Sequence, residues 1–271
     1  DLVDHNTYVI AGDGCLMEGI SQEAISLAGH LKLNKLIVLW DDNDISIDGP
    51  VSISDSTNQK KRFEASGWRV IAIDGHDQTK VAAALRKAKR SDKPTLIACK
   101  TTIGFGSPKV GGTSKAHGAP LGDEEIAVVR KTSGWNFPPF EVPDDVYAAW
   151  KRPGRKGRKA HKAWKARLAE NAKTDDFTRA MKGELNTGWQ AAFADYKAEI
   201  AAEMPKLATR ASSGNALKVL TANLTDMISG SADLEGSNKT KTPSTDVITA
   251  ENYGGRYINY GIREHGMASA M

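Results

Sequence analysis

Two short polar segments of the sequence carry residue types that bind a metal ion and a diphosphate. The first is Gly12-Asp13-Gly14, and the second is the acidic stretch at residues 41–49, which contains Asn43. An Asp carboxylate and an Asn amide oxygen suit a hard cation such as Mg²⁺ or Ca²⁺, and the backbone carbonyl of Ile45 is a candidate third ligand. The glycines let the backbone approach a diphosphate, and the start of the next helix favours its charge. Together the two segments predict a metal and diphosphate clamp.

Each segment alone has a simpler interpretation. A Gly-Asp-Gly triplet is commonly a turn, and an Asp-Asn cluster commonly caps a helix or forms a loop. Their joint occurrence after two successive apolar runs favours the clamp. If those runs are neighbouring parallel strands, Asp13 and Asn43 converge at one edge of the sheet.

The elements that would position these segments alternate along the first third of the chain. Strands are expected at residues 8–11, 36–40, 68–73 and 95–99, and helices at 19–31 and 79–90. The run at 36–40 is apolar throughout, which is typical of a strand covered on both faces of a parallel sheet. Alternating strands and helices predict a doubly wound α/β fold, whose ligands bind at the carboxyl ends of the strands. Polar clusters fall at those ends, at residues 12–14, 41–44, 74–77 and 100–106.

The character of the sequence changes after Pro143. Residues 151–167 are strongly basic and are interrupted by Pro153, Gly154 and Gly157, and an Ala-rich helical segment is expected at about 176–210. This region is predicted to connect two domains. A second α/β unit is then expected, with a helix at 213–223 and strands at 227–230 and near 257–260.

Composition limits the class of protein. The chain has 271 residues, of which 40% are apolar and 26% charged, as in a globular protein with one large or two ordinary domains. Cys15 and Cys99 are the only cysteines, so a reducing compartment, the cytoplasm, is expected. No apolar run is long enough to span a bilayer, so no membrane partner is expected.

The net charge of +4 weakly favours anionic partners, either nucleic acid or phosphorylated metabolites. The chain begins without Met and stops in what resembles a starting helix, so a piece of a longer protein is expected.

Longer motifs around the two segments resemble one family. The spacing from the GDG triplet to Asn43 is similar to the signature of thiamin diphosphate enzymes. The fuller motifs GDGCLMEGISQEA and DDNDISIDG are similar to transketolases in particular. The resemblance continues at residues 73–77, 100–107, 117–122, 210–213, 230–238 and 260–267, and only the basic region at 151–176 lacks family motifs.

This resemblance implies a thiamin diphosphate-binding fold with doubly wound parallel sheets and parts of two domains. Residues 1–142 would be the C-terminal part of the diphosphate-binding domain, 143–210 the interdomain connection, and 211–271 the start of the pyrimidine-binding domain. The implied activity is transfer of a two-carbon ketol unit between sugar phosphates, with thiamin diphosphate and a divalent metal, in a homodimer of the pentose phosphate pathway. The chain alone is expected to be inactive, because family members build each site from more than these segments.

The resemblance also assigns roles to single residues. Glu264 would hydrogen-bond the aminopyrimidine of the cofactor and promote loss of the thiazolium C2 proton. His117 would contact the diphosphate and substrate, and Asp233 would lie near the thiazolium. Arg210 and Ser237 would bind the sugar phosphate. Glu18 and Glu23 would lie at the dimer interface and link the two active sites.

Each of these residues also has a simpler interpretation. His117 and Arg210 could be solvated surface side chains, and Asp233 could be a turn residue. Glu18 and Glu23 lie at a helix start, where acidic residues are favoured in any case.

Two other functions remain open from the sequence. A dihydroxyacetone synthase would share these motifs and would differ in its preference for formaldehyde over ribose 5-phosphate as acceptor. The basic residues 151–167 could form a nucleic-acid-binding module. That stretch contains Trp150 at its edge and Trp164 but no recognised binding motif, so a solvated linker without nucleic acid is the preferred interpretation.

Overall fold

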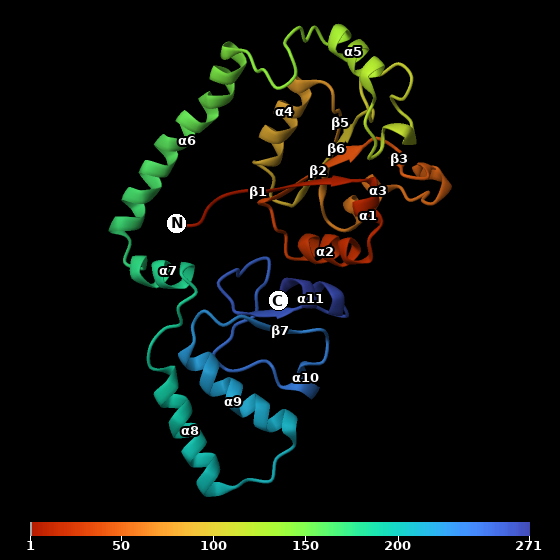
Figure 1. Cartoon of the computed structure of the whole chain (residues 1–271). Helices are drawn as coiled ribbons and strands as arrows, with labels where there is room; N and C mark the ends of the chain where they lie inside the picture. The colour runs from red at the N-terminus through yellow and green to blue at the C-terminus, as the bar shows by residue number, and fades with distance from the viewer. Residues whose placement is uncertain (1) are drawn as a thin grey trace. The chain divides into compact units, whose positions relative to one another are not determined.

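The computed structural model describes residues 2–271, and it divides the chain into a first unit up to Trp164 and a second unit from Lys165. The two units are described separately. The helices and strands of the first unit are shown in the red to green part of Figure 1. None of the helices in the described part of the chain is both long and apolar enough to cross a membrane.

A four-stranded parallel sheet forms the centre of the first unit. Its strands are β1 (Thr7–Gly12), β2 (Leu36–Asp42), β5 (Arg69–Asp74) and β6 (Thr95–Lys100), in the order β1-β2-β6-β5. All three neighbouring pairs are parallel, so the four carboxyl ends lie at one edge. The predicted strands and the parallel α/β sheet are confirmed.

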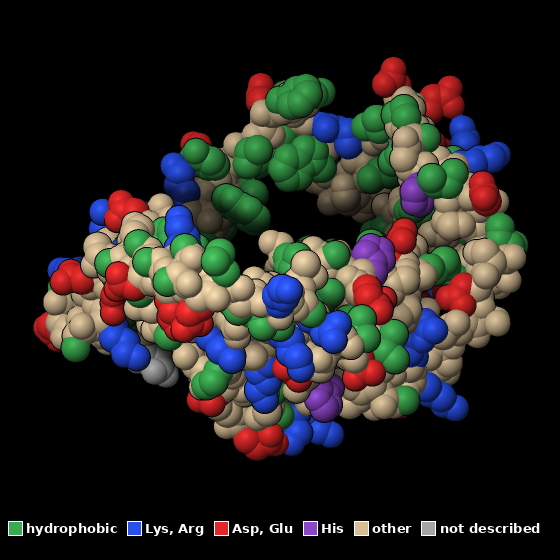
Figure 2. Space-filling model, turned by 90° about the horizontal axis from the view of Figure 1, so that it is seen from below, with side chains coloured by type: hydrophobic (Ala, Val, Ile, Leu, Met, Phe, Trp, Pro, Cys, Tyr) green, Lys and Arg blue, Asp and Glu red, His purple; other side chains and the backbone are tan. Residues whose placement is uncertain are grey.

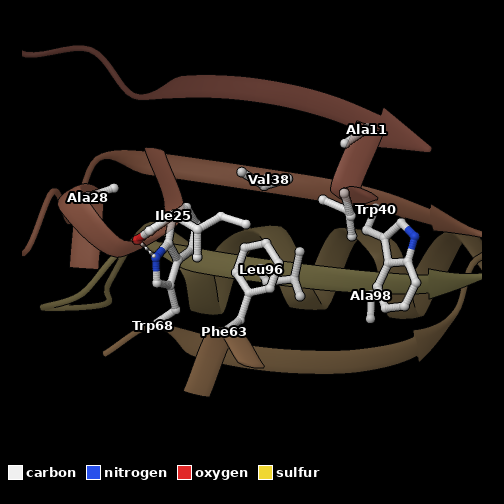
Figure 3. Close-up of a cluster of buried hydrophobic side chains, with 10 residues drawn as sticks. Ala11, Ile25, Ala28, Val38, Trp40, Phe63, Trp68, Leu96 and Ala98 are labelled. Atoms are coloured by element: carbon white, nitrogen blue, oxygen red, sulfur yellow. Dashed lines mark hydrogen bonds between the residues drawn. The ribbon is translucent and has the colours of Figure 1, made fainter. Parts of the chain in front are cut away.

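Helices cover both faces of this sheet. Successive side chains of the inner strands point to opposite faces, and both sets are apolar, so each face needs a covering layer. One face packs on α1 (Asp13–Met17), α2 (Gly19–His30) and α3 (Gln59–Ala65), and contains Val38, Trp40, Leu96 and Ala98 (Figure 3). The opposite face packs Ile37 and Ile97 against α4 (Gln78–Ala88). In Figure 1, α2 and α4 accordingly lie on opposite sides of the strands. The doubly wound arrangement is therefore confirmed.

The remaining elements of the first unit follow the sheet edge. A small hairpin of β3 (Ile45–Ser46) and β4 (Gly49–Pro50) leads into the short 3-10 helix Val51–Ile53. A loop with the 3-10 turn Ser114–Ala116 precedes α5 (Asp123–Thr132). The long helix α6 (Asp144–Glu170) then continues from the first unit into the second.

The expected interruption of the basic stretch is wrong. Pro153, Gly154 and Gly157 all lie inside the continuous helix α6, and none of its residues is buried. A proline removes one intrahelical hydrogen bond, and the Lys, Arg and Ala residues around it are good helix formers. The face of the molecule in Figure 2 carries Lys and Arg side chains interspersed with Asp and Glu.

The second unit contains α7 (Thr174–Met181), α8 (Trp189–Glu203), α9 (Thr209–Asn223) and α10 (Glu235–Asn238). The strands β7 (Ser229–Ser231) and β8 (Tyr257–Asn259) form a parallel pair, and α11 (Glu264–Ala270) follows β8. The helical segment expected at about 176–210 is present, but it is divided among α7, α8 and the start of α9. Gly183, Gly188 and Met204 have positive φ angles, and Pro205 disfavours helical geometry at Met204.

Candidate functional site

The two polar segments meet at the carboxyl edge of the first sheet. Asp13 begins α1 directly after β1, and Asn43 follows β2, the neighbouring parallel strand. The backbone N–H of Asp44 donates to Asp13 Oδ2 at 3.1 Å, which joins the two loops. The convergence expected from the strand pattern is therefore present.

The Asp13 carboxylate is buried, with 8% of the residue exposed. Its Oδ1 accepts a hydrogen bond of 3.1 Å from the indole Nε1 of Trp40, in addition to the Asp44 contact at Oδ2. Burial raises the pKa of Asp13, and the hydrogen bond from Trp40 opposes that rise. A buried carboxylate with a raised pKa gains from a cation that replaces the lost solvation.

Asn43 and Ile45 are held by local hydrogen bonds. Asn43 Nδ2 donates to Asp41 Oδ2 at 3.0 Å, and Asn43 Oδ1 accepts from the backbone N–H of Ile45 at 2.9 Å. An amide oxygen has two lone pairs, so one remains for a ligand. Thr101 Oγ1 donates to the other carboxylate oxygen of Asp41. These contacts fix the side-chain orientation of Asn43.

Three carboxylates gather at this edge, but lysines pair with two of them. Carboxylate oxygens of Asp13, Asp42 and Asp44 all lie within 4.8 Å of one another. Lys100 Nζ pairs with Asp44 and lies 3.4 Å from Asp42 Oδ1, and Lys60 Nζ lies 3.3 Å from Asp42 Oδ2. Within residues 2–271, Asp13 has no such lysine partner. Of these three carboxylates, Asp13 is thus the one whose charge is left for a metal ion.

The neighbouring carboxylates affect the pKa of Lys100. Partial burial lowers the pKa of its ammonium group, but the hydrogen bond to Asp44 and the charges of Asp42 and Asp44 outweigh that effect, so the pKa lies above its usual value. Lys100 therefore stays charged and compensates its two carboxylate partners.

A cavity of about 710 Å³ opens beside these residues. It brings together six of the predicted site residues, namely Gly12, Asp13, Gly14, Asn43, Ile45 and His117. A Cβ added at Gly12 or Gly14 would meet no protein atom within 4 Å. The absence of side chains at these glycines therefore leaves open space that a ligand such as a diphosphate can use.

The loop that carries His117 is anchored from α5. The buried Glu125 accepts hydrogen bonds from Ser107 Oγ and from the backbone N–H of Lys109, the latter at 3.1 Å. The hydrogen bond from Ser107 lowers the pKa of Glu125. His117 itself is exposed and its backbone N–H donates to the Ser114 carbonyl at 2.9 Å. Its imidazole is thus available at the cavity wall.

The other candidates of the first unit lie elsewhere. Glu18 is exposed between α1 and α2, and Glu23 is half-buried within α2. Neither lines the cavity with Asp13.

In the second unit, Asp233 lines a separate cavity of about 480 Å³ after β7, with Ser231 and Asn259. Asp233 has a φ of 62°, a strained conformation for a residue with a side chain. Arg210 in the first turn of α9, Ser237 in α10 and Glu264 at the start of α11 are exposed and do not line this cavity.

Trp40, Lys100 and Glu125 support the site but were not predicted. Trp40 and Lys100 end apolar runs, and Glu125 begins a helix where acidic residues are common. Lys100 lies in the polar cluster expected at residues 100–106, but the partners of Trp40 and Lys100 follow from the register of neighbouring strands that are far apart in the sequence, which no local pattern records.

Comparisons with known proteins assign the chain. Residues 1–186 match the transketolase thiamine diphosphate binding domain, and residues 205–271 match the transketolase pyrimidine binding domain. A transketolase from Cereibacter sphaeroides is 52% identical over 271 residues, which is all of this chain and 41% of that protein. One from Sinorhizobium medicae is 49% identical over the whole chain and 39% of its own length.

Solved structures agree with these sequence relatives. The transketolase from Leishmania mexicana superposes with a TM-score of 0.89 at 41% identity, over 99% of this chain and 40% of that one. The Pichia stipitis transketolase in complex with sedoheptulose-7-phosphate gives a TM-score of 0.90 at 37% identity, over 100% and 41%. The chain thus spans about two fifths of the length of these relatives. It has their α/β fold with thiamine diphosphate-binding domains, and it belongs to the transketolase family.

Proposed function

We propose that the protein containing this chain is a transketolase that moves a two-carbon ketol unit from a ketose phosphate to an aldose phosphate. The observation that carries the proposal is the cavity that Asp13, Asn43 and His117 line together with the glycines of the first loop. The Pichia stipitis relative is described as a complex with sedoheptulose-7-phosphate, a sugar phosphate of the class proposed here as substrate.

The proposed cofactors are thiamin diphosphate and a divalent cation, Mg²⁺ or Ca²⁺. Asp13, the Asn43 amide oxygen and the Ile45 carbonyl would ligate the cation, and Gly12 and Gly14 would leave room for the diphosphate. The choice of Asp13 over Asp42 and Asp44 is supported by the lysines that pair with the latter two. When bound, thiamin diphosphate supplies the nucleophilic carbon and the electron sink of the reaction.

The chain's own residues would position the cofactor and the sugar. Glu264 would hold a proton at the aminopyrimidine ring, and Asp233 would lie near the thiazolium. His117, Arg210 and Ser237 would hydrogen-bond substrate oxygens, and His117 would also contact the diphosphate. Each of these roles is favoured by the family motif that the residue occupies.

The assembly and location belong to the same proposal. We infer a homodimer in which Glu18 and Glu23 lie at the interface, in the cytoplasm and in the pentose phosphate pathway. The domain limits proposed are 1–142, 143–210 and 211–271. No nucleic acid or membrane partner is proposed.

The test is formation of sedoheptulose 7-phosphate from xylulose 5-phosphate and ribose 5-phosphate by the longer protein. We expect turnover that requires both thiamin diphosphate and Mg²⁺. His117→Asn is expected to lower kcat/KM, whereas His30→Asn, an exposed histidine at the end of α2, is expected to leave it unchanged. Faster turnover with formaldehyde than with ribose 5-phosphate would instead support a dihydroxyacetone synthase. No turnover with either acceptor would contradict the proposal.

A further inference from the structure

Trp40 is a buried aromatic residue that directs its one polar atom at Asp13. Trp40 lies on β2 and pairs with Ala11 on the neighbouring strand β1. Asp13 follows Ala11 by two residues, just past the end of β1. Only 6% of Trp40 is exposed, and its Nε1–H donates to Asp13 Oδ1 at 3.1 Å in a buried hydrogen bond. An indole has a single donor and no acceptor, so this contact uses its whole polar capacity.

Packing holds the indole in this orientation. The ring belongs to the apolar cluster with Leu16 and Ala98, and Lys60 Nζ lies 5.8 Å from its centroid. Figure 3 shows the indole nitrogen turned toward the carboxyl ends of the strands, away from Phe63 and Leu96. The ring is only 6% exposed within this cluster, so turning it would require the cluster to open, and the packing restricts the direction of its N–H.

The hydrogen bond from Trp40 helps to fix the orientation of the Asp13 carboxylate and leaves lone pairs free on its oxygens. Asp13 Oδ1 accepts from Trp40 and Oδ2 from the backbone of Asp44, both at 3.1 Å. An ionised carboxylate offers about four lone-pair positions, so each oxygen retains capacity for a cation. Hydrogen bonds of this kind are what orient metal-binding carboxylates, and their loss typically costs about 10–100-fold in metal affinity.

We propose that Trp40 is a positioning residue that orients Asp13 for binding of the divalent cation. This inference rests on the proposed function, since it takes Asp13 as a metal ligand. Phe at position 40 would keep an aromatic ring in the apolar cluster but would leave Asp13 Oδ1 without its donor.

The chain supplies a matched control in Trp68. Trp68 belongs to the same cluster, is 5% exposed, and donates its Nε1–H in a buried hydrogen bond of 2.8 Å. Its acceptor is the backbone carbonyl of Ile25, which is not a site residue. Figure 3 shows this hydrogen bond as a dashed line. Trp40→Phe and Trp68→Phe therefore remove the same group from the same core.

The measurement is the apparent Kd of Mg²⁺ at a fixed, saturating concentration of thiamin diphosphate, made on the longer protein. We expect Trp40→Phe to raise that Kd about 10–100-fold. Trp68→Phe is expected to leave it unchanged, with a loss of melting temperature comparable to that of Trp40→Phe. Unchanged Mg²⁺ affinity in Trp40→Phe, or an equal loss in Trp68→Phe, would overturn the inference.

A second measurement needs no substitution. In protein with ¹⁵N-labelled indoles, the Nε1–H resonance of Trp40 is expected to shift when Mg²⁺ and thiamin diphosphate are added, and that of Trp68 to stay in place. A stationary Trp40 resonance in protein that binds both would overturn the inference, even if Trp40→Phe failed to fold. Failure of the unsubstituted protein to bind Mg²⁺ and cofactor would overturn the proposed function and this inference with it.

Discussion

Asp13→Asn should affect binding and stability in different ways. Asp13 is buried, and burial raises its pKa above the ordinary value of 3.8, so the folded state disfavours the ionised carboxylate. The charge therefore lowers the stability of the metal-free protein at pH values above the raised pKa. This cost disappears as the pH falls through the raised pKa, because the folded protein takes up the proton more readily than the unfolded chain.

The magnitudes follow from the two hydrogen bonds at Asp13. Asparagine keeps the shape, but its NH₂ group must face one of two donors, either Trp40 Nε1 or the N–H of Asp44. Leaving one buried donor unpaired costs about 1–3 kcal/mol. Removal of the buried charge offsets part of that cost, so we expect the free energy of unfolding without metal to fall by about 1 kcal/mol or less.

Cofactor binding should respond much more strongly. The substitution replaces an anionic ligand by a neutral amide, and we expect Mg²⁺-dependent affinity for thiamin diphosphate to fall at least about 100-fold, or about 2.8 kcal/mol. Calorimetric titration with the cofactor near neutral pH, together with urea unfolding without metal, measures both effects. Unchanged cofactor affinity in Asp13→Asn would refute the reasoning.

Asp44→Asn is the matched control, because it removes a charge from the same carboxylate cluster. Asp44 contacts Asp13 through its backbone N–H, which the substitution retains, while its side chain pairs with Lys100. We expect Asp44→Asn to keep most of the cofactor affinity. A loss as large as that of Asp13→Asn would indicate that the Asp13, Asp42 and Asp44 carboxylates bind the metal together.

The same pKa shift predicts a pH dependence of metal binding. The cation binds the ionised form of Asp13, so the affinity for Mg²⁺ should fall as the pH falls through the raised pKa. The decline should therefore begin at a higher pH than for an ordinary Asp with a pKa of 3.8. Asp13→Asn should lack this part of the profile, and a decline that persists there would assign it to another group.

Three further predictions concern other parts of the chain. Glu264→Gln should retain cofactor binding but slow exchange of the thiazolium C2 proton at least about 100-fold by proton NMR in D₂O; an unchanged rate would make Glu264 structural. Gly29→Ala should lower the free energy of unfolding by about 3 kcal/mol, because its Cβ would lie 1.7 Å from the Ser66 carbonyl oxygen. Gly19→Ala in the same helix, where a Cβ meets nothing within 4 Å, should be neutral or stabilising in the same urea titration. A polypeptide of residues 1–271 alone should form no sedoheptulose 7-phosphate above a cofactor-only control, because it spans about two fifths of its relatives and leaves Ile10 of β1 83% exposed; detectable product would contradict this.

The centre of the first sheet could be predicted because its two inner strands, β2 and β6, are largely buried. The run Leu36–Trp40 is apolar at every position, since both faces of β2 are covered by helices. Local patterns of this kind also indicated parallel strands, and parallel neighbours bring their carboxyl ends together. The convergence of Asp13 and Asn43 followed from that geometry.

The connecting helices were predicted less well because nothing buried fixes their limits. None of α6, α7 and α8 has a buried residue, so local propensities decide where each begins and ends. Pro153 lies inside α6 without ending it. Gly188 precedes the start of α8, and Met204, which Pro205 follows, ends it with a positive φ angle. These competing effects are each of the order of 1–3 kcal/mol per residue, too close for composition to decide.

Trp40 and Lys100, which support the site, were not predicted because the register of neighbouring strands determines which residues they contact. Lys100 faces Asp42 across β6 and β2, although 58 positions separate them in the chain. A shift of the register by one residue would turn each of these side chains to the opposite face of the sheet. A sequence motif records neither the order of the strands nor their register.

The choice of supporting groups explains why, of Asp13, Asp42 and Asp44, Asp13 is the carboxylate available to a cation. Lys60 and Lys100 carry positive charge, so they hold Asp42 and Asp44 in place and also cancel their charge. Trp40 and the backbone of Asp44 are neutral donors, so they hold Asp13 in place and leave its charge intact. A lysine at position 40 would also donate to Asp13, but it would compete with the metal for the same carboxylate. A neutral, rigid donor in a buried position therefore meets both requirements of a metal ligand, a fixed direction and an uncompensated negative charge.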